Sequence, residues 1–412
     1  MLHPVLKSVS RAFNEAGISW CLLRVPANLD KPDGGDVDLL VGARDIEAVR
    51  KTLRRLGFLA RGRGSHALFV TYHTPTDCWL WLDVATELSF GSAYALRTHC
   101  EAGLLSRRQR DGEVFMPSAD DAFWSLVLHC LLDKKNIALR HRARLEELVG
   151  LALTNGPLAR VVGAVSPDGW SPERIVETVS RRDWMTLERL AVSLTESKTL
   201  WRSVNPIHLA VHRALRVIRR LLNPWHHPGV SVGLLGPDGA GKSTLATSIQ
   251  NSFIFPVRSI YMGLTGGFLV HADKLRIPLL VIPGRLCVLW SRYIRAQYHQ
   301  LRGRLVIFDR YIYDGLVPPP EQLNWLKQLS RWLDSHACPA PDLVLMLDAP
   351  GDVMYQRKGQ RKHKPEELES ARQQFLALQP RIPQFQIVDA TRTRDQVRAD
   401  VVARIWQLYV VR

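Results

Sequence analysis

The residues with the clearest capacity for chemistry form a glycine-rich loop in the second half of the chain. An apolar run, Val230–Leu235, is followed by Gly236-Pro-Asp-Gly-Ala-Gly-Lys-Ser-Thr244 and a helix-compatible stretch. In a GxxxxGK[ST] loop the glycines let backbone N–H groups point at phosphate oxygens, and the helix N-terminus adds positive charge. The lysine reaches the β- and γ-phosphates, and the serine hydroxyl ligates Mg²⁺. We expect ATP and Mg²⁺ to bind at Gly236, Asp238, Gly239, Ala240, Gly241, Lys242, Ser243 and Thr244, with Lys242 catalytic and Ser243 a metal ligand.

Two later apolar runs end in carboxylates. Leu305–Phe308 leads into Asp309 and Arg310, and residues 341–347 lead into Asp348. An acid at the carboxyl end of a parallel strand would lie beside the phosphate loop. There Asp309 can hold the metal or accept the acceptor's proton, and Arg310 can bind a second phosphate-bearing group. The alternative is structural: Asp309 caps a loop and pairs with Arg310.

A basic cluster follows Asp348, with the sequence Arg357-Lys-Gly-Gln-Arg-Lys-His-Lys364. Basic side chains on a flexible segment after such a strand suit a lid that closes over a triphosphate and stabilises the transferring charge. The alternative is a solvated helix end.

These segments occur in an order that resembles thymidylate kinases and their relatives. The phosphate loop, the Asp-Arg-Tyr triplet at 309–311, the strand into Asp348 and the tail 386–391 carry the resemblance, which spans 230–412. It implies a five-stranded parallel sheet with a helical lid. It also implies that the acceptor phosphate and the metal are contacted by Asp309 and Arg310, and that the adenine lies near Asp389 and Ala390.

The same resemblance assigns a catalytic charge. Some thymidylate kinases carry an arginine inside the phosphate loop, whereas others have glycine there and use an arginine of the lid. This chain has Gly239 at that point, so the resemblance makes Arg357 or Arg361 catalytic. Asp238 matches an acidic position that contacts the acceptor sugar in part of the family.

One family element is missing. The Arg-Glu-Pro-Gly stretch after the second strand is replaced here by residues 259–267, and Arg285, Arg292 and Arg295 are the candidates for acceptor contact. The acceptor therefore stays open among a nucleoside monophosphate, a sugar, a related metabolite and a lipid-linked intermediate.

A second acidic group lies near the N-terminus. Asp36 and Asp38 are two residues apart on an expected strand, which puts both on one face, and Asp83 ends a later strand. Together they could hold divalent metal, and residues 1–135 resemble the nucleotidyltransferase fold. The family's Gly-Ser element is not evident in residues 21–25. The domain is either an active transferase or a binding-only relative, or the two acids belong to a polar turn.

Sequence patterns divide the chain into four parts. Residues 1–117 alternate strands and helices and predict a nucleotidyltransferase-like α+β domain, and 118–222 predict a helical extension whose first helix Ser118 caps. The Pro/Gly-rich segment 223–229 predicts a linker. Strand and helix patterns alternate through 230–412, which is typical of a doubly wound parallel sheet in an α/β P-loop kinase domain.

Composition limits the class of protein. The 412 residues carry a net charge of +16, spread over both halves, and the six cysteines show no CxxC pair and no Cys/His ligand spacing. The N-terminus does not resemble a signal peptide, and residues 277–290 are too short and interrupted to span a membrane. We expect a soluble, cytoplasmic protein, with a homodimer among the assemblies considered and a small-molecule phosphate acceptor, not nucleic acid, as partner.

The leading interpretation is an ATP-dependent phosphotransferase, bifunctional or regulated through its N-terminal domain. The first alternative is a nucleic-acid end-processing enzyme that pairs a kinase with a nucleotidyltransferase. The second is a nucleotidyltransferase that modifies a small molecule, with the P-loop half acting as an ATP sensor.

Overall fold

The computed structural model divides into two compact units, residues 1–219 and residues 220–412. It describes residues 2–24, 36–61, 66–91, 94, 96–196, 228–263, 278–317, 325–358 and 364–412. Of the predicted linker, residues 223–227 lie outside the described residues. No helix among the described residues is long and apolar enough to cross a membrane.

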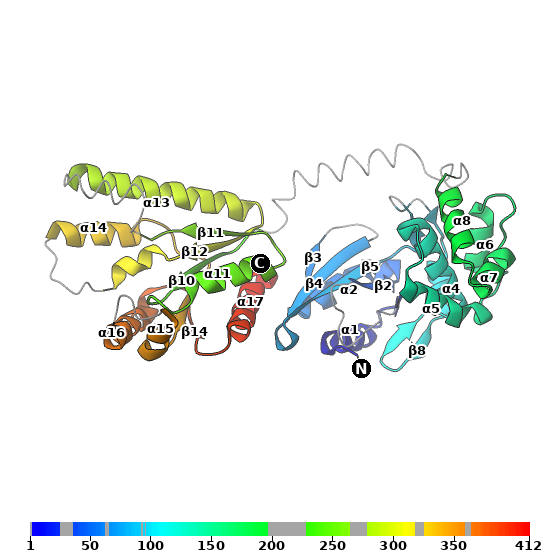
Figure 1. The fold of residues 1–412 in the computed structure, drawn as a ribbon, viewed down its shortest axis with the longest axis horizontal. Helices are drawn as coiled ribbons and strands as arrows, with labels where there is room; N and C mark the ends of the chain where they lie inside the picture. Colours follow the sequence, from blue (N-terminus) through cyan, green and yellow to red (C-terminus); the bar gives the residue numbers. More distant parts are fainter. Residues whose placement is uncertain are drawn as a thin grey trace. The chain divides into compact units, whose positions relative to one another are not determined.

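The second unit is built on a five-stranded parallel sheet (Figure 1). Its order is β11-β12-β10-β13-β14. The strands are β10 (Ser231–Leu235), β11 (Val257–Tyr261), β12 (Leu305–Asp309), β13 (Leu343–Asp348) and β14 (Phe385–Asp389). The five parallel strands that the resemblance implied are confirmed.

Helices cover both faces of this sheet. Every residue of β10 is buried, and β12 and β13 are buried up to their last residue, as expected for central strands covered on both sides. The helices are α11 (Lys242–Ser252), α13 (Pro278–Leu301), α14 (Trp325–His336), α15 (Gly351–Lys358), α16 (Pro365–Leu376) and α17 (Arg394–Val411), with short 3-10 turns η6 (Ile312–Leu316) and η7 (Gln379–Arg381). This arrangement fits a P-loop kinase fold and is α/β.

The first unit has a mixed five-stranded sheet of order β1-β2-β5-β4-β3. Strands β2 and β5 are parallel, and the other neighbours are antiparallel. The strands are β1 (Trp20–Leu22), β2 (Asp36–Val41), β3 (Leu59–Arg61), β4 (His66–His73) and β5 (Cys78–Ala85).

The two faces of this sheet pack against different helices. Leu39 and Val41 of β2 share a core with α1 (Pro4–Glu15) and α2 (Ile46–Arg55). Leu40 points the other way, into a core formed with the helices that follow. Asp36 and Asp38 have the same parity along β2 as Leu40, so they belong to the face covered by those helices.

The remaining elements of the first unit are mostly helical. Ser118 caps the first long helix by accepting a hydrogen bond from the Asp121 N–H at 3.3 Å, as predicted. The elements are two small hairpins, β6–β7 (Ser89–Phe90, Leu96–Arg97) and β8–β9 (Gln109–Asp111, Val114–Met116), and α3 (Glu101–Ser106), α4 (Ala119–Leu128), the π-helical η3 (His129–Lys134), α5 (Leu139–Leu148), α6 (Pro157–Val165), α7 (Pro172–Ser180) and α8 (Trp184–Glu196), with 3-10 turns η1 (Ala43–Asp45), η2 (Thr74–Thr76) and η4 (Val149–Leu151).

Candidate functional site

The phosphate loop joins β10 to α11 in the predicted strand–loop–helix context. Gly236, Gly239 and Gly241 have φ angles of +139°, +92° and +98°, which disfavour any residue with a Cβ. A Cβ at Gly239 would lie 2.7 Å from the Met354 carbonyl oxygen of α15. The loop therefore packs directly against α15, and an arginine at position 239 would not fit.

Lys242 opens α11 and is only 8% exposed. Its Nζ donates hydrogen bonds to the Gly236 and Pro237 carbonyl oxygens, at 2.6 and 2.9 Å. Burial and the Arg310 guanidinium lower the pKa of this ammonium from its ordinary value. The ammonium is thus held across the loop by carbonyls, which phosphate oxygens could replace.

Ser243 and Asp309, the two predicted metal ligands of the second unit, lie next to each other. The Ser243 hydroxyl donates to the Asp309 Oδ2 at 3.2 Å. Asp309 ends β12 and pairs in register with Leu234 of β10, the strand that runs into the loop. Neighbouring oxygens around an octahedral Mg²⁺ lie about 3 Å apart. The 3.2 Å separation of the two oxygens is therefore compatible with both of them holding that ion.

The structural alternative assumed that Arg310 pairs with Asp309. Arg310 instead contacts two other carboxylates. Its Nη2 donates to the Asp238 Oδ1 at 2.6 Å, and its Nη1 lies 3.6 Å from the Asp314 Oδ2. The φ of Arg310 is +65°, a left-handed conformation that is uncommon outside glycine. The guanidinium is therefore held between the phosphate loop and η6.

Asp314 is a site residue that sequence reasoning missed. Its side chain is 23% exposed, and burial raises its pKa to about 6 despite the nearby Arg310 and Lys242 charges. No apolar strand precedes it. The available signal was its position four residues after Arg310, the spacing of an ion pair along one helical turn.

The Asp348 carboxylate is paired with Arg372, which the sequence analysis did not predict. Arg372 of α16 donates to both its carboxylate oxygens, at 2.5 and 3.0 Å, and lies 2.9 Å from Glu369. These contacts raise the pKa of Arg372, with the Asp348 hydrogen bond as the largest cause. Asp348 is thus neutralised by a structural ion pair.

The structure describes only one of the two arginines that were predicted to belong to a lid. Arg357, on α15, donates to the Ala390 carbonyl oxygen at 2.8 Å, beside the loop expected near the adenine. In that loop the Asp389 Oδ1 accepts bonds from the Thr391 N–H and hydroxyl. Arg361 lies outside the described residues.

The three arginines that were candidates for acceptor contact have different surroundings. Arg285 is committed to α14, with its Nη1 3.4 Å from both Ser330 Oγ and Asp334 Oδ2. Arg292 donates to the Gly263 carbonyl at 3.2 Å and lies over the Tyr261 ring, at the carboxyl end of β11. Arg295 is exposed. Arg292 is therefore the one of the three placed at the edge where the phosphate loop lies.

In the first unit, Asp38 and Asp83 are register partners on the parallel strands β2 and β5. Asp36 and Asp38 lie within β2, so the polar-turn alternative is wrong. Burial, then the Asp83 and Asp38 charges, raise the pKa of Asp36. The Arg24 Nε donates to Asp38 Oδ2 at 2.9 Å, so a guanidinium offsets part of this negative charge.

A cavity of about 140 Å³ opens beside these acids. Asp38 and Asp83 line it together with the residues Arg24, His66, Glu87, Tyr94, Ser125 and Asp133. The His66 and Tyr94 rings stack with centroids 4.0 Å apart. Since Ser125 and Asp133 come from α4 and η3, the helical part closes one wall of the cavity.

The tightest ligand cluster among the described residues lies elsewhere and was missed entirely. His3, His73 and Cys78 have ligand atoms that all lie within 4.8 Å of one another, and no second group of three such side chains meets this spacing in the described ranges.

A family model described as thymidylate kinase matches residues 287–401. The matched segment runs from α13 into α17 and includes Asp309, Arg310 and Arg357. It is shorter than the span 230–412 over which the resemblance was drawn, and it leaves out the phosphate loop. With the parallel sheet, it supports a kinase that acts on nucleotides.

Solved structures similar to part of this chain include a thymidylate kinase from Candida albicans, which is 21% identical, with a TM-score of 0.37 and coverage of 45% of this chain and 94% of that one. A deoxyadenosine kinase from M. mycoides with bound dATP is 15% identical, with a TM-score of 0.31 and coverage of 42% and 97%. Likenesses this remote leave the substrate open. No curated protein is detectably similar in sequence. The match to the thymidylate kinase family model is confined to residues 287–401.

Proposed function

We propose that residues 230–412 of the second unit form a kinase domain that transfers the γ-phosphoryl group of ATP to a small acceptor, with a nucleoside monophosphate as the first choice. The observation that carries this proposal is the meeting of Lys242, Ser243 and Asp309 at one edge of the sheet. A buried lysine on a glycine loop, beside two oxygens spaced for Mg²⁺, suits a polyphosphate and little else.

The proposed mechanism gives separate roles to the loop backbone, to Lys242, to Ser243 with Asp309, and to an arginine from outside the loop. The backbone N–H groups of the loop and Lys242 bind the β- and γ-phosphates, with Lys242 exchanging its carbonyl partners for phosphate oxygens. Ser243 and Asp309 would hold Mg²⁺, which would supply positive charge to offset the negative charge that develops during transfer. The loop has no room for an arginine at Gly239. The positive charge that stabilises the transferring phosphoryl group would therefore come from the proposed lid, through Arg361 or Arg357.

The acceptor would be held through Arg310. Its guanidinium is anchored by Asp238 and Asp314, which fix its orientation and leave it able to bind an anionic group. Arg292 supplies a second cation at the carboxyl end of β11. Two arginines at this edge favour an acceptor that already carries phosphate, and a neutral sugar is the alternative.

For the first unit we propose binding, not turnover. Asp36, Asp38 and Asp83 lie on one face beside a cavity, which is consistent with a nucleotidyltransferase-like domain over residues 1–117 and a helical extension from 118. Arg24 already offsets part of the Asp38 charge, however, through a hydrogen bond at 2.9 Å. A Mg²⁺-dependent ligand in this cavity, able to regulate the kinase, agrees with both facts.

A homodimer through α13 is part of the proposal. Trp290, Ile294 and Tyr298 recur every fourth residue along this helix and are 46%, 61% and 51% exposed. Such an apolar stripe on a surface helix is typical of an interface. Light scattering should give twice the chain mass, and Ile294→Glu should halve it.

The function is tested by product identification. Wild-type protein and Lys242→Ala are incubated with ATP, Mg²⁺ and a panel of nucleoside monophosphates and sugars, and the products are identified by mass spectrometry. We expect one acceptor class to gain a phosphoryl group with the wild type alone. Equal product from Lys242→Ala, or none from any acceptor, would overturn the assignment.

A further inference from the structure

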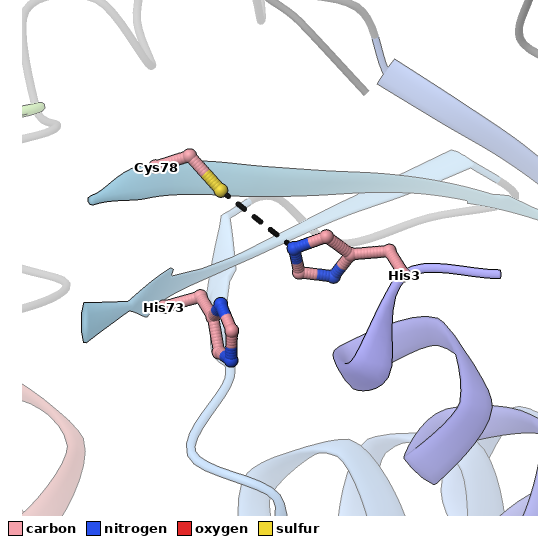
Figure 2. A group of neighbouring side chains, drawn as sticks. All are labelled: His3, His73 and Cys78. Atoms are coloured by element: carbon pink, nitrogen blue, oxygen red, sulfur yellow. Dashed lines mark hydrogen bonds between the residues drawn. The ribbon is translucent and has the colours of Figure 1, made fainter. Parts of the chain in front are cut away.

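Three potential metal ligands meet in the first unit, away from the acidic cavity (Figure 2). His73 ends β4 and Cys78 begins β5, and the two are the last register pair of that hairpin. The register puts both side chains on the same face of the sheet. His3 enters from the residue before α1 and is 1% exposed. Residues far apart in the sequence thus point at one spot.

The hydroxyl of Thr76 lies among these three side chains. Its oxygen is 2.8 Å from the His73 Nδ1, 3.0 Å from the Cys78 Sγ and 3.5 Å from the His3 Nε2. One small polar atom therefore contacts all three potential ligands. Thr76 is exposed, so its side chain can rotate away and leave that position to an ion and a water molecule.

We propose that His3, His73 and Cys78 form a zinc site, with solvent as the fourth ligand. Two imidazole nitrogens and a thiolate are the donors that Zn²⁺ prefers, whereas Mg²⁺ and Ca²⁺ prefer oxygen. The site is separate from the kinase chemistry and does not depend on it. Its effect is structural, because it ties the start of α1 to the β4–β5 hairpin.

The three ligand atoms need to move only a short distance toward one another to bind zinc. At bond lengths of about 2.0–2.3 Å, tetrahedral zinc ligands lie roughly 3.4–3.7 Å apart. The His3 Nε2 and Cys78 Sγ are already 3.8 Å apart. The widest separation, 4.8 Å, requires the ligands to close by about 1 Å, which side-chain rotation on an exposed turn can supply.

The protonation of the two histidines favours zinc binding, whereas that of the cysteine opposes it. Burial lowers the pKa of His3 and of His73 from the ordinary value, which favours the neutral imidazole that binds a metal. The Cys78 thiol must release its proton to solvent when the metal binds. The His3 Nδ1 accepts the Val5 N–H at 3.3 Å, and binding through Nε2 moves the ring proton to Nδ1 and breaks that long bond. The cost is one weak helix cap.

The test is a Co²⁺ titration of untagged, reduced, chelator-treated full-length protein, with excess Mg²⁺ present to occupy carboxylate sites. We expect thiolate-to-cobalt charge transfer and tetrahedral absorption that saturate at one equivalent and disappear when Zn²⁺ is added. Cys78→Ser should abolish the charge-transfer band, and His73→Asn should weaken binding at least roughly 10-fold. The matched control is Cys287→Ser, because Cys287 is the exposed thiol of α13 and lies in the other unit.

Two results would overturn the zinc site. The first is a wild-type titration with no thiolate band saturating at one equivalent, which depends on no variant's folding. The second is loss of the band in Cys287→Ser together with its retention in Cys78→Ser.

Discussion

Asp314→Asn is expected to stabilise the second unit in a pH-dependent way. Burial raises the pKa of Asp314 from 3.8 to about 6, so the ionised carboxylate is less favourable in the folded chain than in the unfolded one. A rise of that size corresponds to about 3 kcal/mol. The penalty is absent below pH 3.8, grows as the pH rises, and is complete above pH 6, which is the folded-state pKa.

The asparagine carries no charge, so it removes this penalty. At pH 8 we expect a gain in the free energy of unfolding of up to about 3 kcal/mol, which is roughly 6–12 °C in Tm for a unit of this size. At pH 5 the penalty is about half developed, so the gain should be about half as large. Calorimetry at both pH values would measure it, on the transition that ATP shifts.

Asp395→Asn is the matched control, because the Asp395 side chain is 85% exposed in the same unit. It should not stabilise the unit at either pH. Equal stabilisation by Asp314→Asn at pH 5 and pH 8, or destabilisation at pH 8, would refute the reasoning about Asp314.

Three further predictions concern named side chains. Lys242→Ala should lower phosphoryl transfer at least roughly 100-fold in a steady-state assay, because it removes a charge aimed at the phosphates, while thermal unfolding stays within a few degrees of wild type. Arg361→Ala should lower kcat on the order of 100-fold with little change in the KM for ATP. Arg357→Ala should instead raise the KM for ATP, because Arg357 contacts the Ala390 carbonyl. A loss of kcat in Arg357→Ala alone would make Arg357, and not Arg361, the catalytic arginine. Asp38→Asn should weaken Mg²⁺ binding to the first unit in calorimetry and leave phosphoryl transfer unchanged, and unaltered Mg²⁺ binding would remove the metal from the proposed cavity.

Local patterns in the sequence were enough to predict much of the kinase unit. The phosphate loop is a contiguous motif, so its glycines, Lys242 and Ser243 could be named without knowing the fold. Asp309 followed from a general rule, that parallel strands bring their carboxyl ends to one edge. The five-stranded sheet followed from the family resemblance and is confirmed.

Contacts between distant segments could not be predicted. Asp348 ends a predicted strand, as Asp309 does, and nothing in the local sequence indicated that Arg372 of α16 would pair with it. Arg24 likewise meets Asp38 only because β1 and β2 pair. The spacing of His73 and Cys78 has no metal signature, since their meeting depends on hairpin register and on His3 arriving from α1. Tertiary packing decides each of these.

The central claim, phosphoryl transfer by the second unit, is tested most directly by following the γ-phosphoryl group through a single turnover. Excess wild-type protein is mixed with γ-labelled ATP, Mg²⁺ and the acceptor identified by mass spectrometry, and the label is assigned at successive times. We predict that the label passes from ATP to the acceptor, and that Lys242→Ala leaves it on ATP. Label that ends in inorganic phosphate, or that stays on ATP in the wild type, would contradict the claim.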